Sequence, residues 1–182
     1  MIERSHQKGD AASVAVYSPC ESYRYLLTRT WAPESARALF VMLNPSTATE
    51  MQNDPTVERC ERRARTLGFG AFRVTNIFGW RATDPKVLRQ VPDPVGPGND
   101  AAIARSATEW VRQGTADRII CAWGTHGTYL DRGEQVALLL SESGQPLHHL
   151  GLTREGHPRH PLYVGYAVQP AIWTDPRGSQ LR

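Results

Sequence analysis

FVMLNPSTATEMQNDPTVERC, residues 40–60, contains the transition that decides the fold: an apolar run ends abruptly at Asn44-Pro45 and becomes polar. The run starts two residues earlier, as ALFVML over 38–43. An unbroken apolar run of this length is typical of a strand that is covered on both faces. A loop needs polar residues, but it does not need this set at the end of a buried strand. The stretch therefore raises the question of whether these polar residues serve packing or chemistry.

The rest of the chain alternates segments of strand and helix character. Apolar runs and alternating patterns predict strands at 13–17, 23–31, 38–43, 72–78, 118–124 and 147–153. Capping residues and helical spacing predict helices at 54–68, 101–112 and 129–143, and a short helix that begins at residue 84. This order favours a parallel sheet with helices on both faces. We expect a three-layer α/β/α sandwich with a central, mostly parallel sheet of four strands and a hairpin added at its edge.

Length and composition predict one domain in a cytoplasmic protein. With 182 residues, of which 40% are hydrophobic, the chain is long enough for one well-buried core, over residues 1–182 with loose termini at 1–12 and 174–182. No stretch is apolar enough to span a membrane, and the charged N-terminus does not resemble a signal peptide. The three cysteines are widely spaced and odd in number, which favours reduced thiols.

The net charge of +3 is unevenly placed. Residues 1–53 carry five basic and five acidic groups and residues 94–182 carry eight of each, so the surplus falls in residues 54–93, with eight basic against five acidic groups. Nineteen of the 21 basic residues are arginine, whose planar guanidinium suits phosphate. A genome rich in G and C produces the same bias, so the basic stretch is only a mild indication of a phosphate-bearing partner.

Polar clusters follow each of the buried strands. Asn44 to Thr47 follow the first strand, Asn76 and GWRAT end the second, Gly124-Thr125-His126 follow the third, and His157 and His160 follow the fourth. In parallel α/β sheets, functional groups collect at the carboxyl ends of the strands. We therefore expect the clusters to converge on one site.

Each cluster also has a purely structural interpretation. Asn44 before proline is a common turn former. Asn76 inside an apolar strand is harder to dismiss, because a buried amide is costly unless its hydrogen bonds are made. A metal site at His157 and His160 has no marked third ligand, so we expect no metal and no cofactor. A metal-dependent nucleotide hydrolase using Asp54, Glu58 and Glu61 is a weak alternative, because these acids begin a helix and cap it well without a metal.

The chain resembles a bacterial and phage family known only as a domain of unknown function. The resemblance runs from about Tyr23 to Tyr163 and is carried by MLNPSTA, NDPT, TNIFGWRATDP, AWG and LGLTREGHPRHPLY. More remotely, the motif order resembles the uracil-DNA glycosylase superfamily. Leu43-Asn44-Pro45 is similar to its G-x-(D/N)-P loop, Asn76 to its base-reading asparagine, Ala122-Trp123-Gly124 to its LWG strand, and His157-Pro158 or His160-Pro161 to its late HPSP loop.

This remote resemblance implies a uracil-DNA-glycosylase-like fold and cleavage of an N-glycosidic bond, with a base flipped out of DNA. Asn44 would orient water, Asn76 would pair with the base edge, and His157 or His160 would donate to the departing base. Pro45, Ser46 and Thr47 would line the base site, while the stacking aromatic has three candidates: Phe78, Trp80 and Tyr163. The phosphate-binding candidates are Arg59, Arg62, Arg63, Arg73, Arg81 and Arg159. The chain departs from the family pattern where Ser46-Thr47 replaces the glycine of mismatch-specific members.

Two hypotheses follow from the sequence. The first is a glycosylase-like enzyme that acts on a base, including a modified one, in DNA. The second is a non-catalytic module that binds a nucleotide or nucleic acid in the same pocket. The sequence does not distinguish DNA from RNA or from a free nucleotide, and it leaves the identity of the base open.

Overall fold

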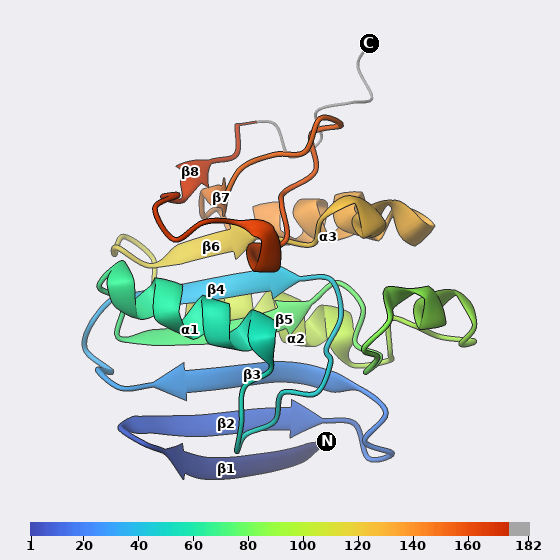
Figure 1. Ribbon diagram of the computed structural model, residues 1–182, viewed down its shortest axis with the longest axis horizontal. Helices are drawn as coiled ribbons and strands as arrows, with labels where there is room; N and C mark the ends of the chain where they lie inside the picture. Colours follow the sequence, from blue (N-terminus) through green and yellow to red (C-terminus); the bar gives the residue numbers. More distant parts are fainter. Residues whose placement is uncertain (175–182) are drawn as a thin grey trace.

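The computed structural model describes residues 1–174, which build one eight-stranded sheet (Figure 1). The strand order is β1-β2-β3-β5-β4-β6-β7-β8. The strands are β1 Ile2–Lys8, β2 Ala11–Tyr17, β3 Arg24–Thr30, β4 Arg37–Met42, β5 Ala71–Asn76, β6 Arg118–Cys121, β7 Leu147–His149 and β8 Ala171–Ile172. The helices are α1 Pro55–Thr66, α2 Asn99–Arg105 and α3 Arg132–Ser141, with short 3-10 turns η1 Pro85–Arg89, η3 Thr125–Asp131 and η4 Pro161–Tyr163 and a π-helical turn η2 Ser106–Trp110.

The expected three-layer α/β/α sandwich with a mostly parallel sheet is wrong. Four of the seven strand pairings are antiparallel, and the described residues contain eight strands but only three α-helices. The parallel part is confined to the middle of the sheet, β5-β4-β6-β7. The fold is therefore a mixed sheet with few helices, and the uracil-DNA-glycosylase-like architecture expected from the remote resemblance is overturned with it.

The edges of the sheet explain this error. Residues 1–12, expected to be loose, instead contain β1, which pairs with β2 along its whole length. Its sequence, IERSHQK, is mostly exposed, so it carries no apolar pattern that reveals a strand. At the other edge β8 is two residues long. Residues 175–182 of the expected C-terminal tail lie outside the described residues.

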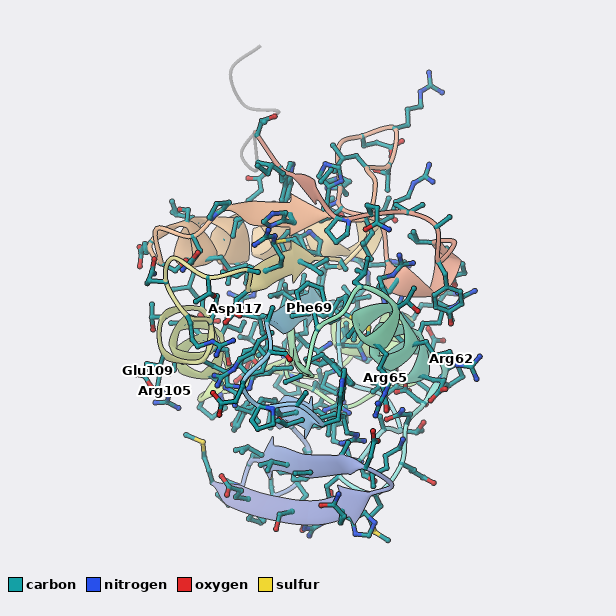
Figure 2. The ribbon with its side chains drawn as sticks, turned by 90° about the vertical axis from the view of Figure 1, so that its left-hand side faces the viewer. Arg62, Arg65, Phe69, Arg105, Glu109 and Asp117 are labelled. Atoms are coloured by element: carbon teal, nitrogen blue, oxygen red, sulfur yellow. The ribbon has the colours of Figure 1, made fainter. Side chains whose placement is uncertain are left out.

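The core has two layers, one on each face of the central strands. In β4, Phe40 and Met42 pack with α1, whereas Leu39 and Val41 pack with α2 and α3. Figure 2 shows the same division, with Arg62 and Arg65 of α1 on one side of the sheet and Arg105 and Glu109 on the other. Because successive strand residues point to opposite faces, the apolar run over 38–43 supplies both layers.

Buried arginines hold the loop that follows β4. This loop crosses in front of β3 and β2 before the chain enters α1 (Figure 1). Arg24 Nη1 donates to Ala48 O at 2.6 Å, and Arg29 Nη2 donates to Thr49 O at 2.7 Å. Burial lowers the pKa of Arg24 to about 10. The antiparallel hairpin β2–β3 thus fixes the path of the loop that carries Asn44.

Candidate functional site

A cavity of about 670 Å³, here called the strand-end pocket, opens at the carboxyl ends of β4 and β6. The loops after β5 and β7 and the start of α1 complete its wall. It is lined by Leu43, Asn44, Ser46, Thr47, Asp54, Pro55, Thr56, Ala82, Thr83, Pro85, Trp123, Gly124, Thr125, His126, Thr153, Arg159, His160, Leu162 and Tyr163. Its volume lies in the range of small-molecule sites, about 300–1,000 Å³. Residues from all four polar loops therefore line one cavity.

The pocket collects only part of the predicted site. Of the predicted residues, those that line it are Asn44, Ser46, Thr47, Arg159, His160 and the stacking candidate Tyr163. Those that do not line it are Pro45, His157, Asn76, Phe78, Trp80, Arg59, Arg62, Arg63, Arg73 and Arg81.

Asn44 ties two loops of the pocket together. Its Nδ2 donates to Ala82 O at 2.7 Å and to Pro45 O at 3.0 Å, and Ala82 N also donates to Pro45 O at 2.8 Å. None of the hydrogen bonds within residues 1–174 ends at Asn44 Oδ1. The amide nitrogen is thus structural, while the amide oxygen is left to accept a hydrogen bond from a ligand or from water.

Asp54 lines the pocket, whereas the sequence indicated only a helix cap or a metal ligand of the weaker hydrolase alternative. It caps α1: its Oδ1 accepts from Val57 N at 2.9 Å, and its Oδ2 accepts a longer bond from Ala48 N at 3.3 Å. Its exposed fraction is 9%, and it lines the pocket. In the sequence, the role of Asp54 as the N-cap before Pro55 was enough to explain its presence. Only its place ten residues after Asn44, in the same connection between β4 and α1, hinted that it belongs to the site.

His160 is a neutral imidazole at ordinary pH. Burial lowers its pKa to about 4, although the nearby Asp54 carboxylate favours the protonated form and the nearby His126 disfavours it. Its Nδ1 is buried and has no partner among the described residues. A neutral imidazole has one donor and one acceptor nitrogen. Because Nδ1 is closed off from the pocket, Nε2 is the nitrogen through which His160 can donate a hydrogen bond to a ligand without carrying a charge.

The sequence left His157 and His160 as alternatives, and only His160 lines the pocket. His157 closes a turn instead: its backbone N donates to Thr153 Oγ1 at 3.2 Å, and its O accepts from Thr153 N at 2.8 Å.

Two aromatic side chains bound the pocket. Trp123 is 2% exposed, whereas Tyr163 is 80% exposed and its ring centroid lies 6.2 Å from that of His160. A flat ligand entering the pocket would meet an exposed phenol at the rim. The other two stacking candidates pack on other rings: the buried Phe78 packs on Tyr129, and the half-buried Trp80 forms a T-shaped pair with Tyr23.

Asn76 is fully buried at 1% exposure. Its backbone O accepts from Asn99 Nδ2 at 2.8 Å, and its own Nδ2 has no partner within the described part of the chain. It does not line the pocket, so its pairing with a base edge stays a prediction that requires the local structure to open.

The candidate phosphate arginines differ in availability. Arg63 is 1% exposed and donates to three backbone carbonyls, so its guanidinium is not free in this structure. Arg62 is exposed and pairs with Glu58, and Arg59 stacks on Tyr166. Arg81 stacks on Tyr17 and donates to Glu21 O. Arg159 is exposed at the pocket.

Within residues 1–174, no group of three or more His, Cys, Asp or Glu side chains is arranged to hold a metal ion. Within the same residues, no helix is long and apolar enough to cross a membrane. The cysteines in this part of the chain are free thiols, and burial raises the pKa of Cys60 and Cys121.

Comparison with known proteins identifies the family and nothing more specific. The model of the family described as "Protein of unknown function (DUF1643)" matches residues 24–162, which is most of the chain. No curated protein and no solved structure matches. The remote resemblance to uracil-DNA glycosylases is therefore not confirmed, whereas the resemblance to a family of unknown function is. The protein belongs to the DUF1643 family.

Proposed function

We propose that this protein hydrolyses the N-glycosidic bond of a nucleotide, with a base flipped out of DNA as the substrate. One observation carries the proposal: Asn44, Asp54 and His160 line the same cavity. Together they offer a free amide oxygen, a carboxylate and an unpartnered neutral imidazole. These are the groups needed to direct water at a sugar carbon and to stabilise a departing base.

The reaction separates charge, and the pocket has a group for each end. As the bond between C1′ and the base nitrogen breaks, positive charge builds on the sugar and the electron pair leaves with the base. His160 donates a hydrogen bond to the base oxygen that becomes negative, a contribution of about 3 kcal/mol by analogy with oxyanion donors. Its low pKa keeps it in the neutral, donating form at neutral pH.

Water attacks C1′ and loses a proton. Asn44 cannot take this proton, because an amide is too weak a base, but its Oδ1 can hold the water in place. Asp54 can take it, since each carboxylate oxygen has a second lone pair beyond the one used by a backbone N–H. The proton passes to the departing base or to solvent, so the products are the free base and a sugar with a hydroxyl group at C1′.

The rim suits a nucleic acid strand. Tyr163 is exposed enough to stack on a base, a contact worth about 1–3 kcal/mol per base. Arg159 is exposed and lines the pocket, which supports a contact with a backbone phosphate while the base enters. The volume of about 670 Å³ leaves room for a base with its sugar.

A non-catalytic module that binds a nucleotide in the same pocket is the second candidate. It is favoured by the structural role of Asp54, both of whose carboxylate oxygens already accept backbone N–H groups. It is also favoured by the many hydroxyl groups of the lining, which bind sugar or phosphate oxygens without any reaction. The hydroxyl-bearing residues are Ser46, Thr47, Thr56, Thr83, Thr125, Thr153 and Tyr163.

One experiment separates the two candidates. The protein is incubated with oligonucleotides that carry uracil, mismatched uracil or modified pyrimidines, and base release and abasic sites are measured beside binding. Release of a base that is lost in Asn44→Ala supports the enzyme. Saturable binding without release supports the module. Neither binding nor release on DNA, RNA or free nucleotides would overturn both.

A further inference from the structure

A second cavity lies apart from the strand-end pocket and shares no lining residue with it. It has a volume of about 280 Å³, and the side chains that matter in it are Arg73, Arg105, Ser106, Glu109 and Trp110. Arg73 comes from β5, and the others come from the end of α2 and from η2. We call it the Arg73 cavity.

Arg73 is a half-buried cation without a carboxylate partner in the described residues. Its Nε donates to Thr28 Oγ1 at 2.9 Å and its Nη1 to Ser106 Oγ at 3.3 Å, both neutral hydroxyls. None of the ion pairs within residues 1–174 involves it. Burial lowers its pKa to about 10, the nearby Arg37 acts in the same direction, and the Glu3 carboxylate opposes them. Charges withdrawn from water are normally paired, yet Glu3 forms no ion pair with Arg73, so no carboxylate contacts this guanidinium within residues 1–174.

The surroundings hold the guanidinium in place. Arg73 Cζ lies 4.8 Å from the centroid of the Trp110 ring, and Arg37 Cζ lies 5.6 Å from it. The turn that supplies Ser106 and Trp110 is π-helical, a rare geometry that is frequent at functional sites. A planar cation stacked on an aromatic ring and fixed at two nitrogens is pre-organised to bind an oxyanion.

The other two charged side chains at the cavity are one arginine, Arg105, and one glutamate, Glu109. Arg105 and Glu109 are exposed and four residues apart, and Figure 2 shows both on the outer side of this helical segment. Neither forms an ion pair within the described residues. Arg105 adds a second donor for an anion, while the Glu109 carboxylate repels one.

We propose that the Arg73 cavity is an anion-binding site that takes a phosphoryl group, with Arg73 as the anchor and Arg105 and Ser106 as further donors. The volume is at the small end of ligand sites, about 300 Å³, which suits a phosphate with a small organic group. A carboxylate presents the same oxygen chemistry and is the competing ligand. This site is independent of the proposed glycosidic hydrolysis.

The test is a titration of the full chain with inorganic phosphate and with acetate at constant ionic strength, followed by the indole N–H signals of the tryptophans. We expect saturable binding of phosphate in the millimolar range. Arg105→Gln weakens it about tenfold, as for loss of a charged hydrogen bond, and Glu109→Gln tightens it severalfold. The matched control is Arg154→Gln, an exposed arginine outside both cavities' linings, which leaves the affinity unchanged.

Arg73→Gln should abolish phosphate binding, but this change at a half-buried position of β5 also risks the fold, so the two exposed variants decide. Phosphate binding that neither Arg105→Gln nor Glu109→Gln alters places the anion elsewhere and overturns the proposal. Absence of saturable phosphate binding in the unmodified protein overturns it as well. If acetate binds more tightly than phosphate, the ligand of the cavity is a carboxylate and the proposal of a phosphoryl group is wrong.

Discussion

Asp54→Asn separates the structural role of this residue from its proposed chemical role. Asparagine keeps an Oδ1 that accepts from Val57 N, the bond of 2.9 Å that caps α1. Asparagine and aspartate are equally good N-cap residues. The amide cannot take a proton from water, so the variant removes the proposed base and keeps the cap.

The expected stability loss is small. In place of Oδ2, the amide nitrogen meets Ala48 N–H, which removes the hydrogen bond of 3.3 Å. One such bond is worth about 1 kcal/mol, which lowers the melting temperature by roughly 2–4 °C in a chain of this size. The variant should thus remain folded at assay temperature.

The expected rate loss is large, since general base catalysis contributes about 10²–10⁴-fold. The assay is single-turnover release of the base from a labelled oligonucleotide, with substrate affinity and melting temperature measured on the same samples. The control is Glu58→Gln, which removes a charge from the first turn of α1 but lies outside the pocket lining. A folded Asp54→Asn variant that releases base within about threefold of the unmodified rate refutes the role of Asp54 as the base.

Three further outcomes follow from the site. Asn44→Ala should keep most of the affinity for substrate but lose most of the turnover, and unchanged turnover rejects the role of Asn44. The variant should also lower the free energy of unfolding, measured by denaturant titration, by about 1–3 kcal/mol, because two hydrogen bonds of Nδ2 are lost. Tyr163→Ala should weaken binding of a base by about 1–3 kcal/mol without changing the melting temperature, because the side chain is 80% exposed; equal affinity would remove it from the site. The pKa of His160 is lowered to about 4 in the folded state from a value near 6.5 in the unfolded state. Between these pH values the folded state binds fewer protons than the unfolded state, so the free energy of unfolding should fall as pH drops through this window. His160→Gln should flatten that fall and leave the contribution of His148 and His149, whose pKa values burial also lowers. An unchanged slope contradicts the neutral imidazole of His160.

The sequence was most informative where residues are apolar and buried. The run over 38–43 predicts β4 because both of its faces need cover, and Asp54-Pro55 predicts the start of α1 because the cap is local chemistry. The fold class failed at the edges. Strand β1 is polar and exposed, and its identity depends on pairing with β2, which no local pattern records.

The sequence predicted which loops form the site, but not which side chains of those loops line the pocket. Strand ends identify the loops after β4, β6 and β7, and these loops do line the pocket. Which side chain faces inward depends on the turn within each loop, so His157 and His160 could not be separated. Asn76 looked functional because a buried amide is unusual, yet its burial is also what keeps it out of the pocket lining.

If the proposed function is right, a nucleobase enters the strand-end pocket and meets His160. A crystal of the protein soaked with a panel of nucleobases and with an uncleavable nucleoside analogue tests this contact. We expect a base between Tyr163 and the pocket interior, with a base oxygen within hydrogen-bond distance of a His160 nitrogen and the C1′ side facing Asn44 and Asp54. A base bound at another surface, or a base in the pocket whose polar edge does not contact His160, would contradict it.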